Sequence, residues 1–484
     1  MLFNSYLFIL VFLPLIVMGY FILNKFRLQT VAQIFVLGMS LWFYGYFSIF
    51  YLVLMLASVG MNYLVYRQME LRKSRQCRRL LLVFGLIFNL SFLFYYKYLD
   101  FLINNINMGF HKDYPLLRLV LPLGISFFTF QQISFIIDAY NKRVPMYSLL
   151  YYASFVTFFP QLIAGPIVTH DELIPQFIDE KKKRINWDNI AKGIYIFTIG
   201  MFKKVILADT FGNAVNWGFQ NIAELDTSNA LIVMLAYTMQ IYFDFSGYCD
   251  MALGIGKMLN IELPLNFNSP YKALRITEFW DRWHITLTRF LTKYVYIPLG
   301  GNRRGRLRTY FNILIVFLIS GIWHGANWTF ILWGGVHGVF VILTRYFKRF
   351  FEEIPLVFNW MITFGFINVT WVLFRAESIE QAFEILHKIM LLDFGTINEN
   401  INKCFQLREL QFLFRATNIE ELCPNFLLLM FFIISIIVTI GGRSAFEKMN
   451  TFKPSFKNLL MTIILMIWCI CSLCGMSTFL YFNF

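Results

Sequence analysis

Three of the six histidines, His284, His324 and His337, lie in or beside apolar stretches of the sequence. Ionisable side chains are costly at membrane depth, and their presence there predicts a functional site. An imidazole can take up and return a proton near neutral pH, as general acid–base catalysis requires. A hydrogen-bonded structural role is equally compatible with any single histidine, so the neighbouring residues must separate the three.

His324 stands in the segment SGIWHGANW, between Gly321 and Gly325. Glycines allow another backbone or a ligand to approach closely. His284 stands on another element, in EFWDRWHITLTRF, whose charged residues offer partners for the imidazole. A third segment, QIYFDFSGYCDMALG, carries Asp244. Because a buried carboxylate needs partners, we expect Asp244 to support packing rather than to perform chemistry.

The elements that position these residues are predicted to be membrane helices. The chain has 484 residues, of which 58% are hydrophobic and 14% charged, and its mean hydropathy is +0.59. A soluble domain is about 45–50% apolar and about 25% charged. Apolar runs of about 18–20 residues, long enough to cross a bilayer as helix, recur along the whole chain. They lie near 5–23, 31–48, 49–66, 79–97, 117–136, 189–208, 229–250, 309–327, 328–345, 355–374, 425–442 and 458–478.

We therefore expect an all-α polytopic membrane protein with about 11–13 transmembrane helices. Segment 147–168 contains FFPQLIAGP, and its prolines interrupt a helix, so we interpret it as re-entrant. Segment 251–308 is expected to form short helices on the cytoplasmic side, and the run EQAFEILHKIMLL predicts a surface helix. Three parts follow: N-terminal transmembrane helices over 1–146, a core over 147–374, and a C-terminal part over 375–484.

The basic residues orient the chain and carry its net charge of +14. Cytoplasmic loops are enriched in Lys and Arg, so the basic loop over 67–79 is predicted to be cytoplasmic. Both termini and segment 375–424 then fall outside the cell. We expect no nucleic-acid partner, since no free basic domain carries the charge. The seven cysteines lie mostly in apolar runs, and no zinc-like ligand set is present, so no metal site is expected.

Long blocks of this sequence resemble the signature blocks of the membrane-bound O-acyltransferases, and FFPQLIAGPIV resembles their re-entrant segment. The bacterial alginate O-acetylase and peptidoglycan O-acetyltransferase membrane subunits are the most similar branch. The resemblance implies that His324 and His284 are catalytic and that His337 is structural. Asp244, Pro160, Gln161 and Asn327 are expected to give structural support. The blocks that carry the resemblance are YFDFSGYCDMALGIGKMLNIELPLNFNSPY, ITEFWDRWHITLTRFLTKYVYIPLGGNRRG and LISGIWHGANWTFILWGGVHG.

The resemblance implies transfer of an acyl group, with acetyl favoured, from a cytoplasmic thioester to an extracytoplasmic polysaccharide. The donor would be acetyl-coenzyme A or an acylated carrier protein, acting as substrate rather than as a bound cofactor. Arg282, Arg289, Arg303 and Arg304 are expected to bind it on the donor side, although positive-inside orientation explains them almost as well. The expected partners are the lipid bilayer of the inner membrane and an extracytoplasmic SGNH-type acyltransferase or esterase. D-alanyl transfer to teichoic acid, a transporter and a non-catalytic scaffold remain alternatives.

The C-terminal residues FLYFNF place Tyr481 near the acceptor side of the predicted final span. An interfacial aromatic anchor is the ordinary role of such residues. The pattern also resembles a C-terminal tyrosine motif of bacterial polymer-acylation systems, which implies that the phenol carries the acyl group outward. A tyrosine can act as a covalent nucleophile, so both interpretations stay open.

Overall fold

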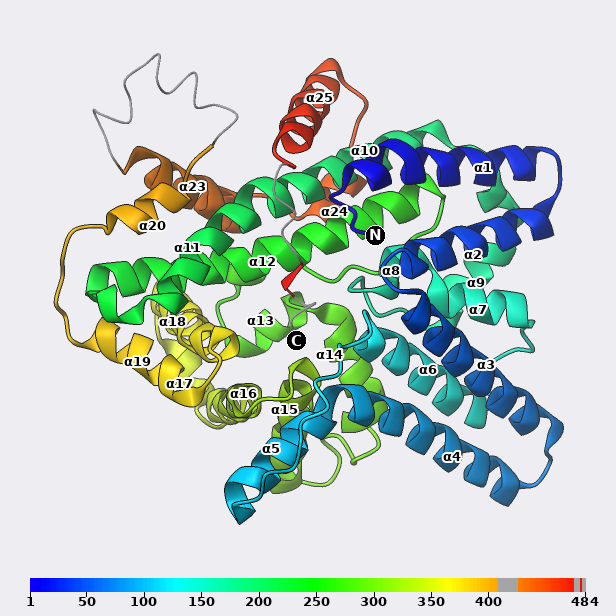
Figure 1. The fold of residues 1–484 in the computed structure, drawn as a ribbon, viewed down its shortest axis with the longest axis horizontal. Coiled ribbons are helices and arrows are strands. Elements are labelled where there is room, and N and C mark those ends of the chain that lie inside the picture. The colour runs from blue at the N-terminus through cyan, green and yellow to red at the C-terminus, as the bar shows by residue number, and fades with distance from the viewer. Residues whose placement is uncertain (408–424, 474–478, 481–484) are drawn as a thin grey trace. The chain divides into compact units, whose positions relative to one another are not determined.

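The computed structural model describes residues 1–407, 425–473 and 479–480. These residues form helices joined by loops, and no strand occurs among them (Figure 1). Within the described ranges, seven helical segments are long and apolar enough to cross a membrane. The prediction of an all-α polytopic membrane protein is thereby confirmed. The seven segments are Phe8–Lys25, Ile49–Leu71, Arg75–Phe110, Thr227–Met258, Arg306–His324, Trp328–Tyr346 and Leu356–Arg375.

Other predicted spans correspond to shorter helices. The span predicted over 117–136 begins as helix only at Ile125, because Pro122 and Gly124 precede it and Gly124 has a φ of 69°. Proline lacks the N–H group that a helix interior needs. The spans predicted over 425–442 and 458–478 correspond to the shorter apolar helices Phe426–Gly441 and Phe456–Cys471.

The contacts divide the chain into two compact units, and each is described here by itself. Unit 1 comprises residues 1–197 and 251–264, and unit 2 comprises residues 198–250 and 265–484. Helices α10 (Trp187–Met201) and α12 (Thr227–Met258) contribute residues to both. The three-part division at 146/147 and 374/375 stays a prediction.

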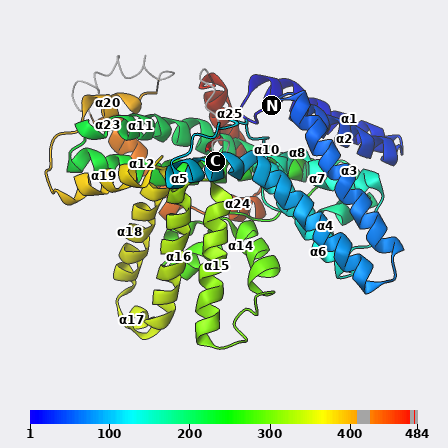
Figure 2. The same ribbon diagram turned by 60° about the horizontal axis from the view of Figure 1, so that its bottom comes forward.

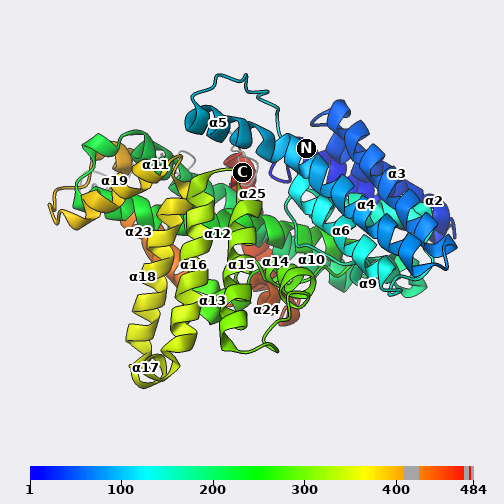
Figure 3. The ribbon, with the colours of Figure 1, turned by 90° about the horizontal axis from the view of Figure 1, so that it is seen from below.

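Unit 1 is built from the helices of the N-terminal part of the chain. Helices α3, α4 and α6 lie side by side (Figure 3), and Asn89 of α4 donates a 2.6 Å hydrogen bond to Asn62 of α3. The helices are α1 (Leu13–Lys25), α2 (Gln29–Gly45), α3 (Ile49–Leu71), α4 (Arg75–Leu93), α5 (Leu99–Phe110), α6 (Ile125–Tyr140), α7 (Leu149–Thr157), α8 (Phe159–Leu162) and α9 (His170–Ile178).

The segment predicted to be re-entrant is a broken helix within unit 1. Helix α7 stops at Phe158, whose ψ of 109° leaves the helical region, and the one-turn helix α8 follows with Pro160 in its first turn. Gln161 is buried, and its amide donates to the carbonyl oxygen of Phe155 at 2.8 Å. The chain then turns back, since α9 packs against α7. The predicted interruption of the helix is confirmed.

Unit 2 holds the remaining helices. The long helices α15, α16 and α18 lie side by side (Figure 2), and α19 packs against α18 with Ala382 and Ile385 buried. The predicted surface helix over EQAFEILHKIMLL is therefore present. The helices are α11 (Asp209–Gln220), α13 (Ile276–Arg282), α14 (Ile285–Leu291), α15 (Arg306–His324), α16 (Trp328–Tyr346), α17 (Lys348–Glu353), α18 (Leu356–Arg375), α19 (Ile379–Met390), α20 (Glu399–Cys404), α23 (Phe426–Ile436), α24 (Ala445–Asn450) and α25 (Phe456–Cys471).

Glycines bring α15 and α16 unusually close. A Cβ atom on Gly321 would lie 2.3 Å from the carbonyl oxygen of Phe330, and one on Gly334 would lie 2.4 Å from that of Phe317. Neither oxygen belongs to a side chain that could move aside. Only glycine fits at this crossing, as the glycines around His324 suggest in the sequence.

Candidate active site

Unit 2 brings together the two histidines that the sequence singles out. His324 is the last residue of α15, and His284 occupies the turn between α13 and α14. Their ring centroids are 6.5 Å apart, and the two side chains are buried, with only 3% and 1% of their surfaces exposed. A small reacting group between the rings could therefore contact both of them.

Asn266 orients His284. The side-chain oxygen of Asn266 accepts the backbone N–H of Thr286 at 3.2 Å and lies 3.1 Å from Nδ1 of His284. An atom that accepts a backbone N–H must be the amide oxygen, so His284 Nδ1 must be the donor. The Asn266 amide nitrogen donates in turn to Sγ of Cys249 at 3.3 Å. These bonds fix the imidazole in the tautomer whose Nε2 carries a lone pair.

That Nε2 atom is buried and has no hydrogen-bond partner among the described residues. His284 lies outside the seven long apolar helices. Burial lowers the pKa of its imidazole to about 3, since the charged form loses its hydration. The backbone at His284 is left-handed, with a φ of 45°, and non-glycine residues adopt this conformation at a cost. The geometry holds a neutral imidazole whose free nitrogen can accept a proton from a hydroxyl or a thiol.

Aromatic rings enclose His324. The centroids of Trp323, Trp333 and Phe374 lie 5.0, 5.2 and 5.0 Å from that of His324. The enclosure excludes bulk water, which strengthens every polar interaction inside it. After His324 the chain turns at Asn327, whose side chain caps α16 by accepting the N–H of Thr329 at 3.1 Å.

His337 is accounted for by its own contacts. Its Nε2 lies 3.1 Å from the hydroxyl of Thr370, and its ring packs against Trp280 and Trp333 at 5.0 and 4.7 Å. The structural role expected for His337 stays a prediction, and this hydrogen bond supports it.

A buried ion-pair network surrounds Asp244, in unit 2. Asp244 accepts from Nζ of Lys204 at 2.5 Å, and Lys204 also binds Asp209 at 2.8 Å. The backbone N–H of Leu480 donates to the second Asp244 oxygen at 2.9 Å. Tyr481, the next residue, lies outside the described part of the chain. Pro160 and Gln161 belong to unit 1.

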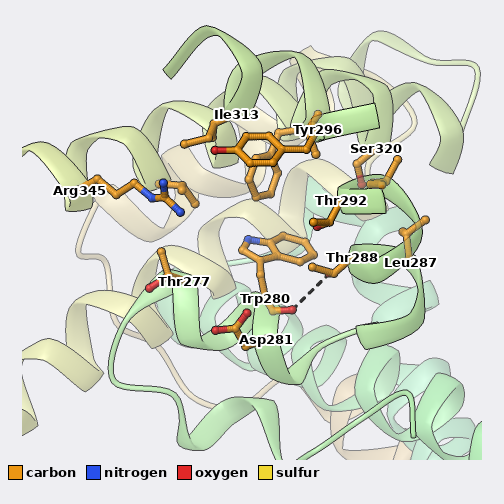
Figure 4. Close-up of a pocket in the computed structure, with 14 residues that line it drawn as sticks. Thr277, Trp280, Asp281, Leu287, Thr288, Thr292, Tyr296, Ile313, Ser320 and Arg345 are labelled. Carbon is orange, nitrogen blue, oxygen red and sulfur yellow. Dashed lines mark hydrogen bonds between the residues drawn. The ribbon is translucent and has the colours of Figure 1, made fainter. Parts of the chain in front are cut away.

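Unit 2 also contains a cavity of about 310 Å³ (Figure 4), and neither His284 nor His324 lines it. It is lined by Trp280, by the hydroxyl side chains of Thr277, Thr288, Thr292 and Ser320, and by Arg345. Ser320 precedes His324 by one turn of α15, about 6 Å along the helix axis. Arg345 and Ser320 lie on opposite sides of the Trp280 indole in Figure 4. The indole nitrogen of Trp280 has no hydrogen-bond partner among the described residues.

Arg345 also lines a second, open cavity of about 790 Å³. Arg306, Lys348 and Arg349 contribute three further cations to this second cavity. The two cavities thus share Arg345: the larger one is basic, and the smaller one has Asp281 as its other charged residue. This arrangement suits an extended molecule that carries phosphate at one end and a neutral chain at the other.

The donor-side role of Arg282, Arg289, Arg303 and Arg304 stays a prediction. Arg282 binds Glu278 at 2.9 Å and donates to the carbonyl oxygen of Asn268 at 3.1 Å. Arg289, Arg303 and Arg304 are exposed and line neither cavity. The sequence reasoning missed Asn266, Trp280 and Arg345 as residues of the site. The local sequence around Asn266 does not indicate its role, because its side chain binds residues of α12 and α14.

Among the described residues, no group of three or more His, Cys, Asp or Glu side chains is placed to hold a metal ion.

Comparison with known proteins gives consistent results. The sequence profile of the membrane-bound O-acyltransferase family, MBOAT, matches residues 4–380. The peptidoglycan O-acetyltransferase of Helicobacter pylori is 41% identical over 100% of this chain and 98% of its own length. The probable alginate O-acetylase AlgI of Pseudomonas aeruginosa is 37% identical over 82% of this chain and 76% of its own length. The teichoic acid D-alanyltransferase of Bacillus subtilis is 29% identical over 54% of this chain and 71% of its own length.

Proposed function

Since this chain belongs to the membrane-bound O-acyltransferase family, we propose that it moves an acetyl group from a cytoplasmic thioester towards hydroxyl groups of an extracytoplasmic polysaccharide. The chain is an acyltransferase and a multi-pass membrane protein. The observation that carries the proposal is the buried histidine pair, with ring centroids 6.5 Å apart. Peptidoglycan is the favoured polymer, because the relative named for it is similar over the whole chain.

The reaction needs a base in a dry site. The attacking hydroxyl oxygen bonds to the acyl carbon, the bond from that carbon to the thioester sulfur breaks, and the hydroxyl proton passes through an imidazole to the departing thiolate. We assign the proton transfer to His324. His284 supports the same step, because its Nε2 is held as an acceptor by the bonds that Asn266 makes.

The two cavities of unit 2 supply the donor side of this proposal. A phosphopantetheine arm, present in coenzyme A and in acyl carrier proteins, has a charged phosphate and an uncharged, amide-containing chain. The phosphate fits the basic cavity around Arg345, and the amide carbonyl groups could accept from the Trp280 indole N–H. The smaller cavity would then direct the thioester towards Ser320, which precedes His324 by one helical turn.

Transfer of the acyl group alone avoids a prohibitive cost. Carrying the phosphates of the donor through hydrocarbon would expose several charges to a low dielectric medium, whereas an acetyl group carries none. An extracytoplasmic SGNH-type enzyme in the same inner membrane system would complete the transfer to the polymer. D-alanyl transfer to teichoic acid is the alternative, and the lower identity and coverage of that relative make it second.

The experiment that tests the proposal measures acyl transfer in proteoliposomes. His324→Ala and His324→Gln should each lose about 10²-fold or more in kcat, the contribution typical of general-base catalysis. His284→Gln should lose activity as well. If its loss in kcat is smaller than that of His324→Gln, His324 is the base. Wild-type turnover in a folded His324→Ala variant would reject the assignment of His324 as the base.

The phenol of Tyr481 is proposed as the first acceptor, which carries the acyl group outward. Support comes from the two residues before it, since Phe479 and Leu480 are buried and Phe479 packs 5.8 Å from Phe245, whose ring contacts His284 at 4.8 Å. Tyr481→Phe keeps an aromatic anchor and removes only the hydroxyl. The relay requires loss of polymer acylation in this variant, whereas full acylation would leave the anchor interpretation.

A further inference from the structure

Two buried lysine–aspartate pairs lie next to each other in unit 2, and they differ in charge balance. Lys203 binds one carboxylate, Asp250, at 2.6 Å, and its Nζ also lies 3.5 Å from the hydroxyl of Ser246. Lys204 binds both Asp244 and Asp209, which is one cation for two anions. A buried carboxylate is stable only when its oxygens find enough donors. Because Asp244 shares Lys204 with Asp209, a further donor to Asp244 stabilises its charge.

The C-terminal segment of the chain supplies that donor. The backbone N–H of Leu480 lies 2.9 Å from Oδ2 of Asp244, while Lys204 occupies Oδ1. A hydrogen bond from a backbone N–H to a carboxylate is stronger than a neutral one. Asp244 and Leu480 are far apart in the sequence, so this bond ties Leu480 to the middle of α12.

Aromatic contacts continue from this bond to the histidine pair. Phe479 packs against Tyr248 at 4.9 Å and against Phe245 at 5.8 Å. Phe245 follows Asp244 directly, and its ring forms a T-shaped pair with that of His284 at 4.8 Å. A single phenylalanine ring thus separates the docked segment from the candidate active site.

We propose that Asp244 is a positioning residue that anchors the C-terminal segment, through the Leu480 N–H, beside the histidine pair. Asp244 then does more than complete a packing network, because it holds Phe479 and Leu480 one phenylalanine ring away from His284. The anchor does not depend on the relay role of Tyr481 or on acyl transfer, and its test needs no activity measurement.

Hydrogen–deuterium exchange at the Leu480 amide is the direct test, in the full-length protein in detergent micelles. Asp244→Asn weakens the charge-assisted bond, so exchange at Leu480 should be at least about tenfold faster than in the wild type. Asp250→Asn is the matched control, because it disrupts the neighbouring buried ion pair without touching the segment, and its exchange at Leu480 should stay within about threefold. Equal acceleration in both variants, or none in Asp244→Asn, would overturn the anchor.

A second pair of variants leaves both ion pairs intact. Leu480→Pro removes the N–H donor, whereas Leu480→Met keeps the donor and most of the apolar volume. Each is combined with Phe479→Cys, and thiol modification at position 479 is followed by mass spectrometry. Modification should be at least about tenfold faster with proline than with methionine, as expected for loss of a charge-assisted hydrogen bond. Equal rates would show that the Asp244 bond does not hold the segment.

Discussion

At the scale of single residues, the candidate site depends on hydrogen bonds that set the state of each imidazole. His284 is useful to an acyltransferase only if its Nε2 is unprotonated. The Asn266 oxygen ensures this, because it accepts from the backbone of Thr286 and can only accept from Nδ1 of His284. A hydrogen-bond partner of this kind does not touch the reacting atoms, but it fixes the tautomer and the orientation of the imidazole.

Substitution of Asn266 tests the role of the tautomer. Asn266→Asp keeps an oxygen that accepts from His284 Nδ1 and from Thr286, so most of the acyl-transfer activity should remain. Asn266→Leu removes the acceptor, and kcat should fall by about 10- to 100-fold, by analogy with the hydrogen-bond partners of metal-ligating histidines. Proteoliposome kinetics on both variants provide the measurement. Equal losses in the two variants would contradict a tautomer-setting role.

The burial of His284 also predicts a pH dependence of stability. Its pKa is about 3 in the folded protein and about 6.5 in an unfolded chain, so the unfolded state binds more protons between these values. Stability should therefore fall as the pH drops below about 6.5, by about 2 kcal/mol at pH 5 from this group alone. His284→Gln should reduce the loss of Tm between pH 7 and pH 5.

The exposed His111 provides the control for this pH dependence. His111→Gln should leave the difference in Tm between pH 7 and pH 5 unchanged. A wild-type pH dependence in His284→Gln would show that His284 is not the group responsible.

At the scale of elements, the crossing of α15 and α16 positions His324. The helices approach so closely that Gly321 and Gly334 face each other's backbones, with Cα of Gly334 3.3 Å from a Cβ built on Gly321. His324 follows Gly321 at the end of α15, so any change in the spacing of the helices moves the imidazole. The same packing places Trp333 of α16 against the histidine ring.

A methyl group at Gly321 should therefore disturb both stability and catalysis. Gly321→Ala would put Cβ 2.3 Å from the Phe330 carbonyl oxygen, and overpacking of this kind costs about 1–3 kcal/mol. We expect a lower Tm together with slower acyl transfer. Gly335→Ala on α16 is the control, since its Cβ meets only Cδ2 of Leu318 at 3.7 Å. Equal changes in Tm and in the rate of acyl transfer for the two variants would show that the helix crossing does not position His324.

At the scale of the whole molecule, the direction of acyl movement depends on how the chain is oriented in the membrane. The basic loops predict that the region around Arg72 and the region around Lys453 are cytoplasmic, with Glu399 outside. All three residues are exposed, so they can report their side, whereas the nearby Ala445 is buried and could not.

Cysteine labelling in intact cells tests this orientation. A cysteine at position 399 should react with a membrane-impermeant thiol reagent, and cysteines at 72 and 453 should react only after the cells are opened. Labelling of position 72 or 453 in intact cells would overturn the orientation. It would also overturn the interpretation of 147–168 as a segment that turns back, because a full crossing there inverts every later loop.

The amino-acid sequence by itself determined the features that depend on local chemistry. Proline and glycine interrupt the helix between α7 and α9, the apolar periodicity produces α19, and the glycines around His324 permit the close crossing of α15 and α16. The length and composition of the apolar runs were enough to establish an all-helical membrane protein. Each of these depends on residues within a few positions of one another.

Only the tertiary structure decided how distant segments meet. It placed His284 against His324, gave His284 its tautomer through Asn266, and joined Leu480 to Asp244. It also brought Trp280 and Arg345 to the lining of one cavity. These contacts join residues on separate elements. The packing of whole helices, which no short stretch of sequence encodes, selects which of many polar residues become neighbours.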